Sequence, residues 1–261
     1  MCTNCGCSVT PGTVHIHSHE DGHEHHHNPD HHHDHSHTHQ TLDVHAAILS
    51  KNDRLAERNR GFFLAKQLFV LNVLSSPGSG KTALIEKTLT DLGDRLKSAV
   101  IVGDLETDND AKRLRRSGME VVQITTGSIC HLEADMVSQA LTQINLDDLK
   151  LLFIENVGNL VCPAAYDLGE NIRVALLSVT EGEDKPLKYP TLFKTADVAI
   201  INKIDIAEVV GFDRNAATEN IRRIVPSAKI LEVSARTGEG MDAWYRYLQE
   251  ACGCLEQSAS H

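Results

Sequence analysis

The sequence has too little positive charge for a protein that binds nucleic acid. It contains 25 Lys and Arg residues against 36 Asp and Glu residues, which gives a formal net charge of −11 at pH 7. Neutralising a phosphate backbone needs a dense basic patch, and no cluster of Lys and Arg of that density occurs. We therefore expect no nucleic acid among the partners of this protein.

Long apolar runs are also missing. A membrane-spanning helix needs about 20 mostly apolar residues in a row, and no stretch of the sequence approaches that length. The N-terminus lacks the apolar core of a secretory signal peptide. These absences predict no membrane partner and a cytoplasmic location. The 261 residues suffice for one sizeable α/β core with some length left over.

The cysteines do not form an even set that would suggest a disulfide framework. There are seven, namely Cys2, Cys5, Cys7, Cys130, Cys162, Cys252 and Cys254. An odd number without a secretory signal favours metal thiolates or free thiols. The first three lie too close together to bridge one another, but they can converge on one soft or borderline metal ion. The amine of Cys2 is a possible fourth ligand, and a redox-active or unused thiol cluster is the alternative. Cys252 and Cys254 receive no role.

A low-complexity stretch rich in histidine follows, with 13 His among the 25 residues from 15 to 39. It can bury almost nothing, so we expect disorder in the absence of metal. Imidazole suits nickel, zinc and copper, and this density predicts several loosely held ions and hence metal storage. The predicted storage ligands are His15, His17, His19, His23, His25, His26, His27, His31, His32, His33, His35, His37 and His39. Residues 1–40 are therefore predicted to be a metal-binding segment.

Residues 41–261 are predicted to form one nucleotide-binding domain with an N-terminal helix. Helical spacing of apolar residues runs over 41–60, and Gly61 is expected to end that helix. Seven apolar segments then alternate with stretches compatible with helix. They are residues 68–74, 99–102, 121–124, 151–154, 174–179, 198–201 and 230–233. This alternation predicts an α/β fold, a mostly parallel sheet with helices on both faces.

The first strand runs into a phosphate-binding loop. The segment 68–82 reads LFVLNVLSSPGSGKT, and a strand, a Gly-containing turn and a helix start follow one another in it. Ser75 stands where the usual P-loop pattern has Gly, but the context favours a P-loop NTPase. Lys81 is expected to reach the β- and γ-phosphates, and the Thr82 hydroxyl to bind Mg²⁺. The predicted phosphate-contacting residues are Pro77, Gly78, Ser79, Gly80, Lys81 and Thr82.

Acidic residues follow two further strands. Asp104 is our first candidate for a Mg²⁺ ligand or water-orienting group, with Asp108 or Asp110 second, and a solvated turn that caps a helix is the alternative. Glu155 begins a strand-acid-x-x-Gly turn in which it would hold Mg²⁺ through water while the Gly158 N–H senses the γ-phosphate. Lys81, Asp104 and Glu155 are the predicted catalytic residues.

A purine-reading motif follows the sixth strand. Asn202-Lys203-Ile204-Asp205 has the N-K-x-D form in which the Asp carboxylate accepts from N1–H and N2–H₂ of guanine. Ser234 and Ala235 follow the last strand, and the Ala235 N–H is expected to meet guanine O6. In this order after a phosphate loop, these motifs predict GTP as the nucleotide.

The ordered set SSPGSGKT, GDLETDND, ENVGNLVCP, NKID and VSART, with the leading CTNCGC, resembles the HypB family, the hydrogenase nickel-incorporation GTPases. The resemblance spans nearly the whole chain. It implies a SIMIBI-type P-loop GTPase that forms a homodimer around nucleotide. It also implies delivery of nickel, with an accessory protein, to the large subunit of [NiFe]-hydrogenase. The family's metal sites fall on Cys2, Cys5 and Cys7 and on Cys130, His131 and Cys162, where Zn²⁺ is also possible.

Residue chemistry alone leaves Cys130 and Cys162 open as ligands, because cysteine is often a small buried hydrophobe. Cys162 lies four residues past Gly158, so a metal held there would sit on the element expected to move when GTP becomes GDP. Asn159 stands where Ras-like GTPases carry a water-orienting Gln, so we expect slow intrinsic hydrolysis that needs dimerisation or a partner.

Two other readings stay open. One is a urease accessory GTPase, although that relative carries Cys-Pro-His where this chain has Ala164 after Cys162-Pro163. The other is a nickel storage protein whose nucleotide domain only regulates it.

Overall fold

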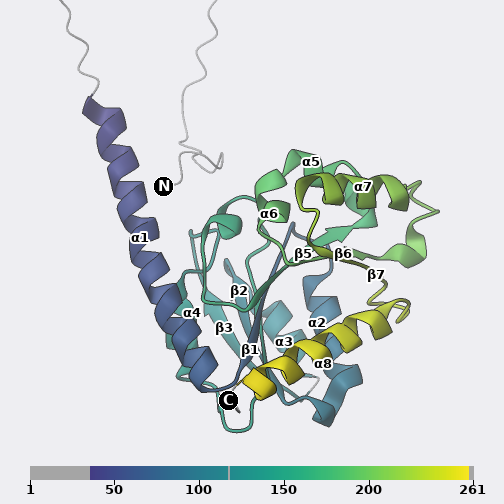
Figure 1. The fold of residues 1–261 in the computed structure, drawn as a ribbon, viewed down its shortest axis with the longest axis horizontal. Coiled ribbons are helices and arrows are strands. Elements are labelled where there is room, and N and C mark those ends of the chain that lie inside the picture. Colours follow the sequence, from purple (N-terminus) through teal and green to yellow (C-terminus); the bar gives the residue numbers. More distant parts are fainter. Residues whose placement is uncertain (1–35, 117, 259–261) are drawn as a thin grey trace, which may run out of the picture. The chain divides into compact units, whose positions relative to one another are not determined.

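The computed structural model describes residues 36–116 and 118–258 (Figure 1). The compact part of the chain begins at Leu49, and it carries every contact described below. The predicted site of Cys2, Cys5 and Cys7 and the histidines from His15 to His35 lie outside the described residues. The predicted P-loop fold lies within the compact part.

Seven strands form one parallel sheet. They are β1 (Phe69–Ser75), β2 (Ser98–Asp104), β3 (Glu120–Thr125), β4 (Leu151–Glu155), β5 (Ile172–Ser178), β6 (Val198–Asn202) and β7 (Lys229–Val233). The order across the sheet is β3-β2-β4-β1-β5-β6-β7, and every neighbouring pair is parallel. Each predicted apolar segment coincides with a strand, so the predicted α/β class and parallel sheet are confirmed.

The register places the functional loops at one edge. Strand β1 lies in the middle, between β4 and β5, and Val73 pairs with Glu155 of β4. The carboxyl ends of parallel strands meet at the same edge of a sheet, where open α/β sheets bind ligands. The loops that follow β1, β2, β3 and β4 therefore converge there.

Helices cover both faces of the sheet. They are α1 (Ser36–Ala65), α2 (Lys81–Leu92), α3 (Asn109–Arg115), α4 (Ala134–Leu141), α5 (Lys185–Lys188), α6 (Pro190–Lys194), α7 (Arg214–Ile224) and α8 (Met241–Ser258). Short 3₁₀ turns are η1 (Gly93–Arg95), η2 (Cys162–Ala165), η3 (Val179–Glu181) and η4 (Ile204–Ile206). None of the helices in the described ranges is long and apolar enough to cross a membrane.

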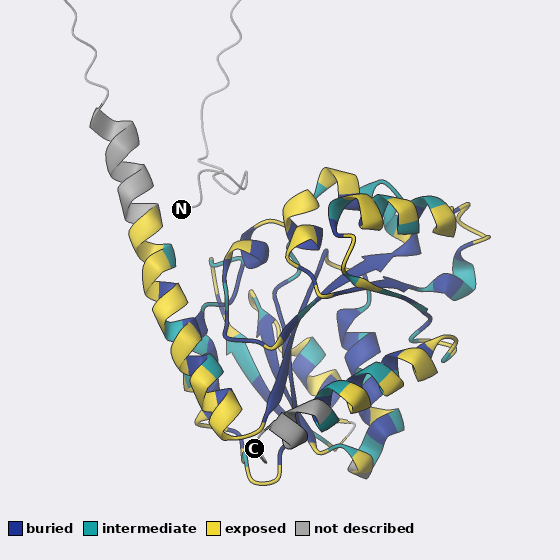
Figure 2. Ribbon diagram, viewed as in Figure 1, coloured by how far each residue is buried: buried dark blue, intermediate teal, exposed yellow. Residues whose placement is uncertain are grey.

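Successive side chains of a strand point to opposite faces of the sheet, so apolar residues form a core on each face. Leu71 and Val73 of β1 pack with α2, α3 and α8, where Trp244 is fully buried. Val70 packs with α1 and α4, and Leu74 with α6 and α7. Figure 2 shows the inner strands mainly dark blue and the outer sides of the helices largely yellow. A strand buried on both faces reads as a continuous apolar run, which is why these strands were predictable.

The first helix is longer than predicted. It runs from Ser36 to Ala65, so Gly61 lies inside it and the expectation that Gly61 ends it is wrong. The helix ends where Gln67 adopts a left-handed φ of 52° and the Leu68 N–H donates to the Phe63 carbonyl. Residues 36–39, expected to be disordered in the absence of metal, are helical. The predicted division between residues 40 and 41 falls within this helix and stays a prediction.

Candidate nucleotide and metal site

The loop between β1 and α2 has the backbone of an anion-binding turn. Gly78 and Gly80 have φ values of 76° and 100°, in the left-handed region that favours glycine. A Cβ on Gly80 would also lie 2.6 Å from the Asn202 side chain. Lys81 opens α2 and donates from Nζ to the Ser75 hydroxyl at 3.0 Å. Ser75, which replaces the usual glycine, thus holds the lysine over the loop.

Thr82 and Glu155 form the candidate Mg²⁺ site. The Thr82 hydroxyl donates to Glu155 Oε1 at 2.7 Å, whereas the buried Oε2 has no hydrogen-bond partner in the described residues. Burial raises the pKa of the Glu155 carboxyl to about 7, against the opposing effects of Lys81 and Thr82. An orphaned carboxylate oxygen beside a phosphate loop fits a hard cation that prefers oxygen ligands.

A cavity of about 480 Å³ is lined by the predicted phosphate and magnesium residues except Ser79, whose buried hydroxyl donates to the Ser76 carbonyl at 3.0 Å. Lys81, Thr82, Asp104, Glu155 and Gly158 all line it. Asp104 Oδ1 accepts from the backbone N–H groups of residues 106 and 107, so this carboxylate also caps its own turn.

The second-choice acids separate in the structure. Asp110 lines the cavity, whereas Asp108 pairs with Lys112 at 2.8 Å and does not line it. Arg113, which sequence reasoning did not single out, lines the cavity and pairs with Glu86. It places a positive charge on the same cavity as Lys81.

Gly158 lies against the phosphate loop. A Cβ on this residue would sit 3.1–3.2 Å from three atoms of Pro77, including backbone atoms, which is closer than ordinary van der Waals contact. The close approach of Pro77 therefore favours glycine here, and the φ of Gly158 does not. The contact joins the predicted γ-phosphate sensing turn to the phosphate loop.

The predicted guanine-reading loop is tied to the phosphate loop. Asn202 Nδ2 donates to the Ser79 carbonyl at 3.0 Å, and Lys203 Nζ donates to the Gly78 carbonyl at 2.6 Å. Lys203 has a φ of 65°, an uncommon conformation for a non-glycine residue. These bonds fix the two loops that would hold the base and the phosphates.

Asp205 already accepts hydrogen bonds on both of its oxygens. Ser234 donates to Oδ1 at 2.6 Å, and Arg236 donates to Oδ2 at 2.7 and 3.0 Å. The Ser234 bond and the Arg236 guanidinium hold the pKa of Asp205 below its usual range. The Ala235 N–H, predicted to meet guanine O6, donates to Asn202 Oδ1 at 3.2 Å. The Arg236 side chain is 77% exposed.

Cys130, His131 and Cys162 come together. One ligand atom from each lies within 4.8 Å of the other two, which is the spacing of groups that can share one metal ion. Cys130 and His131 come from the loop after β3, and Cys162 opens η2 after the Gly158 turn. His131 and Cys162 are buried and Cys130 is half-buried. The two thiols are not joined in a disulfide.

His131 has the surroundings of a ligand. Within the described chain neither of its ring nitrogens has a hydrogen-bond partner, and Nε2 lies 3.6 Å from Glu133 Oε1. Burial lowers the pKa of the imidazole, which favours the neutral form that binds metals. The Tyr166 ring stacks on it with centroids 3.8 Å apart. Buried imidazole nitrogens without partners are costly unless a ligand satisfies them.

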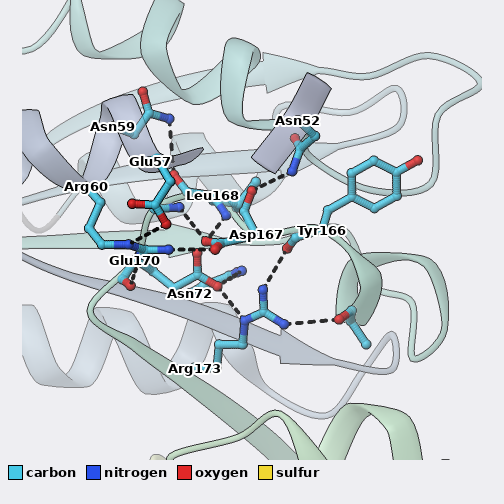
Figure 3. A network of polar contacts seen from close by, with 12 residues as sticks. Asn52, Glu57, Asn59, Arg60, Asn72, Tyr166, Asp167, Leu168, Glu170 and Arg173 are labelled. Carbon is cyan, nitrogen blue, oxygen red and sulfur yellow. Dashed lines mark hydrogen bonds and ion pairs between the residues drawn. The ribbon is translucent and has the colours of Figure 1, made fainter. Parts of the chain in front are cut away.

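Helix α1 holds both metal-bearing loops (Figure 3). Asn52 donates to the Asp167 carbonyl and accepts from the Ala134 N–H. Asn59 donates to the Ala134 carbonyl at 2.8 Å and to the Leu168 carbonyl at 3.1 Å. The loops that carry His131 and Cys162 are therefore fixed against one helix.

Sequence reasoning missed the polar residues that connect these loops. Asn72, Asn156 and Glu170 are buried and hydrogen-bonded to one another or to neighbouring loops. The available signal was a single Asn within the apolar run of β1. A buried polar side chain needs a hydrogen-bond partner, so an Asn in this position indicates a buried hydrogen-bond network.

The chain resembles known proteins over most of its length. Residues 69–232 match the family model "CobW/HypB/UreG, nucleotide-binding domain". Proteins named hydrogenase maturation factor HypB are 54% identical in Azotobacter vinelandii, over 81% of this chain and 70% of the relative, and 51% identical in Escherichia coli K12, over 80% and 72%. A solved structure of HypB from Helicobacter pylori in complex with nickel is 43% identical, with a TM-score of 0.74 over 77% of this chain and 95% of that one.

A P-loop, a parallel seven-stranded sheet and a Cys/His cluster thus occur in a chain that is about half identical to these maturation factors over four fifths of its length. The chain belongs to the HypB family of hydrogenase maturation factors.

Proposed function

We propose that this protein is a cytoplasmic GTPase that binds, stores and delivers nickel for the maturation of [NiFe]-hydrogenase. The carrying observation is the position of the Cys130, His131 and Cys162 cluster. Cys130 and His131 lie in the loop after β3, and Cys162 lies in the loop after β4. The loop after β4 also carries Gly158, which lines the nucleotide cavity. A change of nucleotide therefore acts on a loop that carries a nickel ligand.

The nucleotide part of the proposal is supported by the cavity. Lys81 supplies positive charge for the β- and γ-phosphates, and Thr82 and Glu155 supply oxygen ligands for Mg²⁺. Bound Mg²⁺ would neutralise phosphate charge. Asp205 provides the carboxylate that distinguishes guanine from adenine.

The metal part is supported by the donor set. Thiolate and neutral imidazole suit Ni²⁺ and Zn²⁺, and the three donors leave coordination positions for a transferable ion or for donors from a second copy. We propose nickel as cargo, because the family is that of hydrogenase maturation factors and a relative has been solved with nickel. Zinc is the competing ion.

A homodimer formed on nucleotide binding is part of the proposal. Leu105 and Val161 are apolar side chains about two-fifths exposed, beside the nucleotide cavity and beside Cys162 respectively. Covering them with a second copy would remove apolar surface from water at the site itself. The proposed partners are an accessory protein and the hydrogenase large subunit.

The test is nickel transfer from the purified full chain, loaded with nickel, to a nickel-free hydrogenase large subunit in the presence of the accessory protein. We expect transfer with GTP and little transfer with a non-hydrolysable analogue. Cys162→Ser is the matched control and should lose the GTP-dependent part. Equal transfer with GTP, with the analogue and without nucleotide would contradict the delivery role and would favour storage.

A further inference from the structure

A buried amide joins the nucleotide-sensing turn to the nickel-binding loops. Asn156 lies between Glu155 and Val157, and only 1% of its surface is exposed. Its backbone N–H donates to the Val73 carbonyl of β1 at 3.2 Å, so the residue is anchored to the strand that leads into the phosphate loop. It lines the nucleotide cavity together with Thr82 and Glu155, and its side chain makes hydrogen bonds to other loops.

The carbonyl oxygen of this side chain connects two loops at once. Oδ1 accepts from the Val157 N–H at 2.9 Å and from the Leu132 N–H at 3.2 Å. Val157 precedes Gly158, and Leu132 follows His131 directly. One atom thus links the turn that would sense the γ-phosphate to the backbone beside a predicted nickel ligand.

The amide nitrogen begins a second connection. Asn156 Nδ2 donates to Asn72 Oδ1 at 3.1 Å, and Asn72 Nδ2 donates to Glu170 Oε1 at 3.1 Å. Glu170 accepts from Arg173 Nε at 2.6 Å. Figure 3 shows Asn72, Glu170 and Arg173 in one connected network.

This second connection ends in the other half of the metal site. Arg173 donates to the carbonyls of Ala164 and Tyr166, each at 3.0 Å. Ala164 lies in η2 with Cys162, and the Tyr166 ring stacks on His131. The chain of bonds that starts at Asn156 therefore reaches both metal-bearing loops.

We infer that Asn156 is the positioning residue through which the nucleotide state sets the geometry of the nickel site. The inference rests on the proposed function. A buried donor or acceptor that loses its partner costs free energy. A loop that moves is therefore expected to keep its buried hydrogen bonds. When the γ-phosphate draws Val157 and Gly158, the Asn156 amide follows and shifts Leu132 together with the Asn72 branch. A small ligand displacement then changes nickel affinity.

The test measures the nickel dissociation constant of the full chain with GDP and with a non-hydrolysable GTP analogue, both with Mg²⁺. Cys2, Cys5 and Cys7 are replaced by Ser, so that nickel–thiolate absorbance reports the domain site while imidazole-bound nickel contributes none. The signal of the same protein carrying Cys162→Ser is subtracted. The ratio of the two dissociation constants measures the coupling, which we expect to be at least about fivefold.

Asn156→Ala should bring that ratio to within about twofold of one. The matched control is Asn59→Ala, which removes another buried Asn that holds the same two loops but has no bond to residues 155–158. It should weaken nickel binding by the same factor with either nucleotide and leave the ratio unchanged. A purely structural role of Asn156 predicts this second pattern for both variants.

A wild-type ratio in Asn156→Ala would overturn the inference while leaving the proposed function intact. If the background protein itself shows no ratio, the inference falls, and the transfer experiment above decides the function separately. Thermal melting and GDP binding establish that each variant is folded. Should Asn156→Ala fail to fold, Asn72→Ala releases the orienting bond on the amide, and an unchanged ratio there would equally overturn the inference.

Discussion

At the scale of single residues, the Glu155 carboxyl makes the metal-free protein sensitive to pH. Burial raises its pKa to about 7 from an ordinary value of 4.5. Between these values the folded protein keeps a proton that the unfolded chain releases, so the free energy of unfolding falls as the pH rises from about 5 to 7.

Glu155→Gln should remove this contribution, which is on the order of 2 kcal/mol between pH 5 and pH 7. Urea unfolding in EDTA at pH 5 and pH 7 measures it, and Glu120→Gln, an exposed acid on β3, serves as the control. If wild type and Glu155→Gln lost the same stability over that range, the carboxyl would not be the group responsible.

Asp205 provides a second prediction at this scale. Its carboxylate is expected to accept from N1–H and N2–H₂ of guanine, whereas xanthine carries a carbonyl at position 2. Asp205→Asn supplies an amide N–H that can donate to that carbonyl. We therefore expect the variant to lose GTP binding by about tenfold or more and to gain xanthosine triphosphate binding.

Competition against a fluorescent nucleotide measures both affinities. Arg236→Ala is the control, because it removes the competing partner of Asp205 and leaves the carboxylate in place. Unchanged preference for GTP in Asp205→Asn would show that another group reads the base.

The residues that the sequence could identify are those in motifs with a fixed order. Lys81 and Thr82 belong to a P-loop and Glu155 to an acidic strand end, and both patterns can be recognised from residue spacing alone. The structure places all three residues around one cavity. Asn156 and Tyr166 could not be found in this way. Their roles depend on which loops lie side by side, and that is set by strand order and packing.

At the scale of elements, helix α1 shows why its end was mispredicted. Gly61 is exposed, and a Cβ there would meet nothing within 4 Å, so this glycine is tolerated inside the helix. Burial of Phe63, which is 1% exposed, continues the helix beyond it. Tertiary packing of this kind overrides a helix propensity difference of about 1 kcal/mol.

Gly61→Ala should accordingly stabilise the protein by about 0.5–1 kcal/mol, because it removes backbone freedom from the unfolded chain. Urea unfolding at constant slope measures the gain. The converse comparison is Gly80→Ala, where the φ of 100° and the approach to Asn202 should make the same substitution destabilising. A loss of stability in Gly61→Ala would mean that α1 is not helical there in solution.

The five inner strands were predictable because each is almost fully buried on both faces and therefore mostly apolar, whereas the edge strands β3 and β7 are only partly buried. The loops after β3 and β4 were not predictable in shape. Their shape depends on distant partners, because Asn52 and Asn59 of α1 hold them through bonds across 75 to 115 positions of sequence.

At the scale of the whole molecule, the histidine-rich segment and the Cys130, His131 and Cys162 cluster are expected to act separately. Deleting residues 15–39 should lower the number of nickel ions bound per chain by several, since the 13 histidines are lost. The nickel–thiolate absorbance and GTP-dependent transfer should be retained. Equilibrium dialysis with metal analysis measures the stoichiometry.

Replacing the same segment by a Gly/Ser linker of equal length controls for the altered chain length. If the deletion abolished transfer as well, the histidines would belong to delivery and not to storage.

The order of strands in the sheet also determines when each strand can pair during synthesis. Strand β1 pairs only with β4 and β5, which are made roughly 80 to 100 residues later at the ribosome. Its edges therefore stay unpaired until those two strands have been made. Cys130 likewise emerges well before Cys162. The cluster can thus form only after residue 162 has been made, whereas Cys2, Cys5, Cys7 and the histidines from His15 to His39 are made earlier.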